Sequence, residues 1–218
     1  VAGHSLGEFS ALVSANVINF EDALKIVKIR SIEMSNAGRK KPGGMAAILG
    51  ADEDQIKEIC KQDGIVVPAN INAPGQIVIS GELNSIESAI STAKQIGVKR
   101  AVKLNVSGAF HSPLMTPARK ALLDIIKTID FQNAQIPIFQ NVTATAVTNA
   151  NNIRENIINQ LENPVLWYKT IMNLDVLGIN EYYEVGPGKV LKGLNKRILP
   201  NSLTTLCDKI ENLNACAL

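Results

Sequence analysis

The chain has few histidines, no excess of either charge and no long apolar run. Its 218 residues include only two histidines, and 22 basic residues face 20 acidic ones, which gives a net charge of +2. This balance gives no sign of a nucleic-acid or membrane-surface partner. No apolar run reaches the roughly 20 residues that a membrane-spanning helix needs. We therefore expect no nucleic-acid partner and no membrane association.

Cysteine is also scarce. Cys60, Cys207 and Cys216 lie far apart and form no CxxC pair. That spacing suits neither a disulfide framework nor a zinc site, so we expect free thiols in a reducing compartment. No signal peptide is visible in the chain as given. The sequence thus predicts a cytoplasmic protein with no metal and no resident cofactor.

Apolar residues make up 46% of the chain, enough for a real core, and helical and strand patterns alternate along it. Residues 43–106 follow the order strand, helix, strand, strand, helix, strand, which is the ferredoxin-like βαββαβ pattern. The stretch "NAGRKKPGG" before it is predicted to be a linker, and the tail from Leu199 is weakly patterned. We expect an α/β fold with a larger part, residues 1–42 and 107–218, and an inserted part, residues 43–106.

The sequence Gly3-His4-Ser5-Leu6-Gly7 fits the G-x-S-x-G pattern of a nucleophile elbow. In such an elbow the serine lies in strained backbone at a strand-to-helix turn, and the flanking glycines avoid a clash of Cβ atoms. The hydroxyl then stands above a helix N-terminus, whose partial positive charge favours a developing oxyanion. A helical pattern follows directly. Ser5 is therefore the candidate nucleophile and the Leu6 N–H a candidate oxyanion donor, although the pattern also occurs by chance in glycine-rich turns.

A serine nucleophile needs a general base, which is most often histidine. His4 adjoins Ser5, and we expect its side chain to diverge at a tight elbow. His111, in "SGAFHSPL", is then the candidate base, although on its own it also fits a loop histidine. No carboxylate suggests itself as a third member, so the sequence allows a histidine oriented by a backbone carbonyl.

One arginine lies where a helix is expected to be buried. In the helix predicted from residue 20 to about residue 36, Arg30 falls in the same stripe as Ile26 and Met34, with Phe20, Ala23 and Val27. A buried charge is costly unless it is paired. The guanidinium either reaches water past the helix edge or awaits an anionic substrate, whose carboxylate it would hold with two hydrogen bonds.

Five segments together resemble one family. These are "GHSLGE", "VKIRSIEM", "GAFHSPLM", "QLENPVLW" and "EVGPGKVLKGLNKR". They are similar, in order and spacing, to segments of the malonyl-CoA:acyl carrier protein transacylases of type II fatty acid synthesis. The resemblance covers nearly the whole chain. It implies an α/β-hydrolase-like large subdomain with an inserted ferredoxin-like small subdomain, and a monomer.

The resemblance also implies roles for single residues. Ser5 would carry a malonyl ester, His111 would act as base and acid, and Arg30 would pair with the malonyl carboxylate. The main-chain carbonyl of Gln160 would orient the histidine. Malonyl-CoA and acyl carrier protein would be the two substrates of a ping-pong reaction.

Two further residues carry weaker expectations. In related acyltransferases a bulky aromatic before the histidine, here Phe110, is associated with malonyl rather than methylmalonyl units; it also fits an ordinary core residue. Asn70, in "ANINAPGQ", is similar to a family residue that faces the cleft. We expect the "EVGPGK" turn to be structural.

Alternatives remain open within the sequence. The chain fits an acyltransferase domain of a polyketide synthase, a plain serine esterase, or an inactive fragment that only binds acyl carrier protein. Arg30 argues against the esterase, because a neutral ester gives its charge no partner. The family carries a Gly-Gln-Gly loop that supplies a second oxyanion donor, and no such loop occurs here. We therefore expect an enzyme that is incomplete at its N-terminal end.

Overall fold

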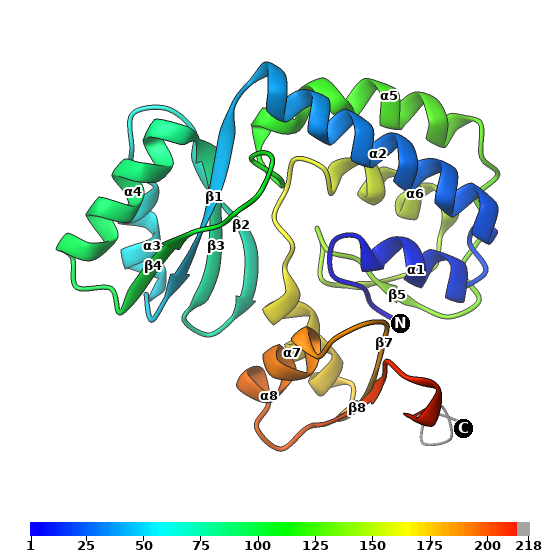
Figure 1. The fold of residues 1–218 in the computed structure, drawn as a ribbon. Helices are drawn as coiled ribbons and strands as arrows, with labels where there is room; N and C mark the ends of the chain where they lie inside the picture. Colours follow the sequence, from blue (N-terminus) through cyan, green and yellow to red (C-terminus); the bar gives the residue numbers. More distant parts are fainter. Residues whose placement is uncertain (213–218) are drawn as a thin grey trace.

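The computed structural model describes residues 1–212 as a mixed α/β fold in which an antiparallel sheet with its own helices lies on one side and a cluster of further helices on the other (Figure 1). The helices are α1 (Gly7–Ser14), α2 (Phe20–Lys40), α3 (Glu53–Cys60), α4 (Leu83–Gln95), α5 (Thr116–Lys127), α6 (Ala150–Asn159), α7 (Trp167–Val176) and α8 (Val190–Ile198), with a 3₁₀ turn at Pro113–Met115. The strands are β1 (Gly43–Leu49), β2 (Val66–Ala73), β3 (Gln76–Glu82), β4 (Arg100–Lys103), β5 (Ile138–Phe139), β6 (Ala146–Val147), β7 (Glu181–Val185) and β8 (Leu203–Cys207).

The segment from β1 to β4 forms a four-stranded antiparallel sheet in the order β2-β3-β1-β4, with α3 and α4 packed on it. Helices and strands follow one another as the sequence predicts for residues 43–106. The sheet and the two helices enclose a core of their own, which is built mainly from Ile48, Ile56, Ile59, Ile79 and Ile86. Ile48 and Ile79 lie on β1 and β3, where β-branched side chains fill a pleated face well, and Ile56, Ile59 and Ile86 meet them from α3 and α4.

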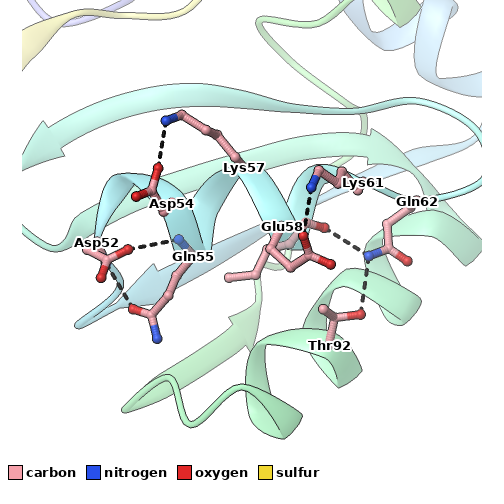
Figure 2. A network of polar contacts seen from close by, with 9 residues as sticks. Asp52, Asp54, Gln55, Lys57, Glu58, Lys61, Gln62 and Thr92 are labelled. Atoms are coloured by element: carbon pink, nitrogen blue, oxygen red, sulfur yellow. Dashed lines mark hydrogen bonds and ion pairs between the residues drawn. The ribbon is translucent and has the colours of Figure 1, made fainter.

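Helix α3 begins with a capping box. The Asp52 side chain accepts from the Gln55 N–H at 2.8 Å, and the Gln55 side chain accepts from the Asp52 N–H at 3.0 Å (Figure 2). Lys57 pairs with Asp54 on the exposed face of the same helix. The capping box satisfies the Asp52 and Gln55 N–H groups and so marks where the helix starts.

The rest of the structure is mostly helical around a second core. Helices α1, α2, α5 and α6 bury a set that includes Leu12, Ile26, Leu122, Ile126 and Ile157. The remaining strands form two small sheets, β5 antiparallel to β6 and β7 parallel to β8. Ala2 pairs in parallel with Phe139 of β5, so the residues just before α1 run alongside that strand. This pairing leads the chain into the turn at Ser5.

Two backbone hydrogen bonds of the kind found between strands join β2 to Val165, and so join the β1–β4 sheet to the helical part. The Ile71 N–H of β2 donates to the Val165 carbonyl, and the Val165 N–H donates to the Ala69 carbonyl, both at 2.9 Å. Val165 precedes α7, which also contacts β2. This seam ties the β1–β4 sheet to the helical part close to Ser5.

Helix α2 is longer than the sequence analysis predicts. The stretch expected to be a linker from residue 36 is helical to Lys40. Arg39 and Lys40 favour the helix because cations in a last turn interact well with its C-terminal carbonyls. The helix ends at Lys40. The next residue, Lys41, is extended because Pro42 disfavours the α region for the residue before it. Gly38 stays in the helix, where a Cβ would meet the Ser107 carbonyl.

Other local expectations are corrected. Residues 136–144 contain a strand of two residues only, and the weakly patterned tail contains β8. Phe20 is 62% exposed, so it lies outside the buried stripe of α2. Cys60 is free, but Cys207 is disulfide-bonded. The absence of a CxxC pair concerns sequence neighbours alone, whereas a disulfide depends on distance in space. Cys216 lies outside the described residues.

Two absences hold for the part of the chain that the structure describes. No helix there is both long and apolar enough to cross a membrane. Nor does that part contain a group of three or more histidine, cysteine, aspartate or glutamate side chains able to hold a metal ion.

Candidate active site

Ser5 occupies the strained turn that its motif predicts. Its φ is +50°, in the left-handed region that residues other than glycine rarely adopt, and α1 begins two residues later. A Cβ at Gly3 would overlap the carbonyl group of Gly7, so a glycine is required there. A Cβ at Gly7 would meet nothing within 4 Å. The expectation that both glycines prevent a clash is therefore right for Gly3 and wrong for Gly7.

Asn141 holds this turn from the far side. Its Oδ1 accepts from the Ser5 N–H at 2.7 Å, and its amide group donates to the Gly3 carbonyl at 2.6 Å. Asn141 is 2% exposed and follows β5, which runs beside residues 1 and 2. A buried amide that bonds both sides of the turn offsets part of the backbone strain at Ser5.

His111 lies against the hydroxyl of Ser5. Its Nε2 is 2.8 Å from Ser5 Oγ, and its Nδ1 is 2.8 Å from the main-chain oxygen of Gln160. A carbonyl oxygen only accepts, so Nδ1 carries the hydrogen and Nε2 presents its lone pair to the Ser5 hydroxyl. The Gln160 carbonyl is free for this bond because the last carbonyls of a helix, here α6, lack intrahelical donors.

The loop that carries His111 is held close to α2. Gly38 and Gly108 let the two backbones approach, since a Cβ on Gly38 would meet the Ser107 carbonyl. Ser112 caps the following 3₁₀ turn, accepting from the Leu114 N–H and donating to the Ala109 carbonyl. His111 itself has φ +58°, so both residues of the pair stand in left-handed backbone.

The site keeps the imidazole neutral. His111 is 3% exposed, and burial lowers its pKa to about 4. The hydrogen bond to the Gln160 carbonyl acts in the opposite direction, because it favours the protonated ring. The positive charge of Arg30 lowers the pKa further. At neutral pH the ring is therefore in the form that accepts a proton.

Arg30 points into the site and does not reach out to solvent. It is 8% exposed, and its Nη2 donates to Ser5 Oγ at 3.2 Å and to Gln160 Oε1 at 3.1 Å. Its guanidinium carbon lies 5.6 Å from the centre of the Phe9 ring. Burial lowers the pKa of Arg30 to about 10, so it remains charged at neutral pH. The structure thus places a buried cation beside the serine, as the helix phase predicts.

Comparison with known proteins shows which family the chain belongs to. Residues 1–187 match the family model described as an acyl transferase domain. The malonyl CoA-acyl carrier protein transacylase of Bacillus subtilis is 43% identical over 201 residues, covering 90% of this chain and 63% of its own length. The chain belongs to the malonyl CoA-acyl carrier protein transacylase family.

Solved structures of transacylases match as well. A crystal structure of an acyl carrier protein S-malonyltransferase from Vibrio cholerae is 39% identical with a TM-score of 0.94, and the match covers 99% of this chain and 72% of that one. A malonyl-transacylase in complex with its type II PKS acyl-carrier protein is 40% identical with a TM-score of 0.93, over 98% and 71%. The chain therefore spans roughly two thirds of the length of these transacylases.

The candidate site opens into a cavity of about 360 Å³ beside Ser5. Phe110 forms one wall and also packs against both the large core and a smaller cluster around Met45. It therefore both lines the cavity and packs against the core, and its effect on acyl selectivity stays a prediction. The cavity is lined by Ser5, Arg30, Ser31, Met34, Ser35, Ser107, Phe110 and His111.

Leu6 and Asn70, the two remaining residues expected at the site, differ in their positions. Leu6 is at the N-terminal end of α1, and its N–H has no acceptor within residues 1–212, so it is free to serve as an oxyanion donor. Asn70 is 8% exposed at the seam with Val165 and does not line the cavity. Its contact with a substrate stays a prediction.

Two residues near the elbow, His4 and Glu8, lie in surroundings that the sequence analysis does not predict. His4 Nε2 lies 2.8 Å from Asn72 Oδ1, and its ring packs at 5.6 Å from that of Trp167. As expected it diverges from Ser5, and it links the elbow to β2. Glu8, three residues after Ser5, is completely buried beneath it. An acid in a first helical turn is common at the surface, so the sequence gives little signal of this burial.

Proposed function

We propose that the protein transfers a malonyl group from malonyl-CoA to the phosphopantetheine thiol of acyl carrier protein. The observation that carries this proposal is the convergence of two side chains on one oxygen. Ser5 Oγ lies 2.8 Å from a neutral imidazole and 3.2 Å from a buried guanidinium. The imidazole activates the hydroxyl, and the guanidinium suits an acyl group that ends in a carboxylate.

In the first half-reaction Ser5 Oγ attacks the thioester carbonyl of malonyl-CoA, and its proton passes to His111 Nε2. The Leu6 N–H stabilises the oxyanion that forms on the carbonyl oxygen. The tetrahedral intermediate then releases coenzyme A, whose sulfur takes the proton from His111. The product is a malonyl ester on Ser5 and a neutral imidazole.

In the second half-reaction the thiol of acyl carrier protein gives its proton to His111 and attacks the ester carbonyl. Ser5 leaves and recovers a proton from the imidazolium, so the enzyme returns to its starting state. Arg30 holds the free carboxylate of the acyl group throughout and so fixes the ester against the attacking thiol. The acyl group held by Arg30 also fills the cavity and so keeps out water, which is the competing nucleophile.

The fold supports a division of labour between the two parts. We assign residues 1–42 and 107–218 to an α/β-hydrolase-like subdomain that carries Ser5, His111 and Arg30. Residues 43–106 are assigned to a ferredoxin-like subdomain, on the strength of the β2-β3-β1-β4 antiparallel order. The Val165 seam and the His4–Asn72 hydrogen bond would hold that subdomain over the elbow.

A second carrier class is favoured by one comparison. The malonyl-transacylase that is 40% identical to this chain was solved with an acyl-carrier protein of a type II PKS. Transfer to a polyketide carrier uses the same chemistry at Ser5. The buried Arg30 continues to argue against a plain esterase, since a neutral ester leaves its charge without a partner.

The test is malonyl transfer in two stages. The chain is incubated with malonyl-CoA, and purified acyl carrier protein of the fatty acid or the polyketide type is then added. The proposal expects loss of malonyl from Ser5 together with its gain on the carrier thiol. Release of malonate to water at the same rate with and without carrier would refute transfer.

A further inference from the structure

Glu8 is a completely buried acid with no role in the mechanism above. It stands on α1, and both of its carboxylate oxygens accept hydrogen bonds. Oε2 accepts from Gln160 Nε2 at 2.6 Å, and Oε1 accepts from the Asn141 N–H at 3.3 Å. Within residues 1–212 Glu8 forms no ion pair. A buried carboxylate is costly, so its retention beneath the nucleophile asks for a reason beyond packing.

The carboxylate decides which way the Gln160 amide faces. A carboxylate only accepts, so the NH₂ group of Gln160 must point at Glu8. The amide oxygen is thereby turned to Arg30, whose Nη2 donates to it at 3.1 Å. The reversed amide would set its oxygen against the carboxylate and its NH₂ against the guanidinium, two repulsive contacts in a dry interior. The same NH₂ group also donates to the Ser5 carbonyl at 3.0 Å.

The Gln160 amide therefore orients the Arg30 guanidinium without neutralising its charge. Its partners are the amide oxygen of Gln160 and the hydroxyl of Ser5, and it forms no ion pair within the described part of the chain. Its charge remains available to a substrate carboxylate. Glu8 supplies the nearest negative charge, separated from Arg30 by the Gln160 amide.

We propose that Glu8 is a positioning residue that sets the preference for a carboxylate-bearing acyl group: it orients the Gln160 amide, which aims the Arg30 guanidinium at Ser5. This inference rests on the proposed malonyl transfer and deepens it. Gln160 then acts twice, through its main-chain carbonyl on His111 and through its side chain on Arg30.

The ionisation of Glu8 fits this role. Burial raises its pKa to about 7, while hydrogen bonds from Gln160, Asn141 and Gln140 and the charge of Arg30 favour the ionised form. The carboxylate, which can only accept and so orients the Gln160 amide, is therefore the main form above about pH 7, and the donors around it favour that form.

The decisive experiment uses Glu8→Gln, which keeps the shape but presents one donor and one acceptor where the carboxylate has two acceptors. Ser5 acylation is measured with malonyl-CoA and with acetyl-CoA, and the ratio of the two kcat/KM values is compared with that of the wild type. We expect this ratio to fall by roughly tenfold or more, the loss expected for a hydrogen bond to a charged group. Glu87→Gln, which removes an exposed carboxylate paired with Lys103, is the matched control and should keep the ratio.

A purely structural role for Glu8 would lower both activities together and leave the ratio unchanged, which would overturn the proposal. Gln160→Leu keeps the main-chain carbonyl for His111 and removes only the side-chain link, so it tests the same path if Glu8→Gln does not fold. It should lower the ratio too, and in the double variant the two losses should not add. Unchanged selectivity in Gln160→Leu, or additive losses, would contradict the proposal.

These outcomes are separable from failure of the proposed function. If wild-type Ser5 is acylated by malonyl-CoA in preference to acetyl-CoA and passes the malonyl group to acyl carrier protein, the proposed function holds and only the Glu8 path is under test. If the wild type shows no such preference, the proposed function itself fails, whatever the variants do.

Discussion

The Nδ1 atom of His111 lies 2.8 Å from the main-chain oxygen of Gln160, where a Ser-His-Asp triad has a carboxylate. A carbonyl fixes the tautomer and the ring orientation, but it carries no full charge to stabilise an imidazolium. This agrees with a pKa of His111 lowered to about 4 by burial. A weak base suits a thioester, because a thiolate leaves far more readily than an amine.

The pH dependence of acylation follows from this environment. His111 acts as base only when neutral, so lowering its pKa from the ordinary 6.5 to about 4 moves the acid-side loss of activity down by the same amount. We expect kcat/KM for Ser5 acylation by acetyl-CoA, whose acyl group has no free carboxylate, to persist well below pH 6. An acid limb centred at 6.5 would contradict the buried, neutral imidazole.

Replacing the buried arginine should change selectivity more than chemistry. Arg30→Ala removes the cation that faces the acyl carboxylate, so kcat/KM for malonyl-CoA should fall by about 10- to 100-fold relative to acetyl-CoA. Arg30→Lys keeps the charge but loses the planar fork, and should recover only part of the preference. Competition between the two thioesters for Ser5 measures both variants. An unchanged malonyl preference in Arg30→Ala would refute the carboxylate clamp.

The two glycines of the elbow should respond in opposite ways. In Gly3→Ala the new Cβ overlaps the Gly7 carbonyl, which the backbone can relieve only by moving the elbow. We expect a loss of about 3 kcal/mol in unfolding free energy and loss of acylation. Gly7→Ala places a Cβ in open space at the start of α1, and should be neutral or stabilise by about 0.5 kcal/mol. Chemical denaturation of the two variants compares them directly, and equal losses would contradict the geometry.

Much of the secondary structure follows from local sequence. The βαββαβ order of residues 43–106 is found as predicted, and α2 begins as predicted at Phe20, where the Asn19 side chain accepts from the Asp22 N–H. The errors arise where tertiary contacts override local signals. Gly38 looks like a linker residue but lies in α2 because the loop at Ser107 needs the space. Strand β8 escapes notice because its five residues form a strand only by pairing with β7.

The site residues likewise divide into those that local sequence predicts and those that it does not. Ser5 is found from its motif, His111 from the scarcity of histidine, and Arg30 from its phase on α2, each a property of the sequence itself. The role of Gln160 comes from family resemblance, since nothing in a helix C-terminus singles out one carbonyl. Glu8 has no local signal at all, because only the packed structure distinguishes a buried acid from an exposed one in a first turn.

The malonyl ester on Ser5 is the intermediate on which the proposed transfer depends. Intact-mass and peptide mass spectrometry after mixing the chain with malonyl-CoA should show one malonyl group on the peptide that contains Ser5. The same experiment on Ser5→Ala should show none. An adduct that persists on Ser5→Ala, or wild-type chain that carries malonyl at another residue, would contradict the assignment of Ser5 as the nucleophile.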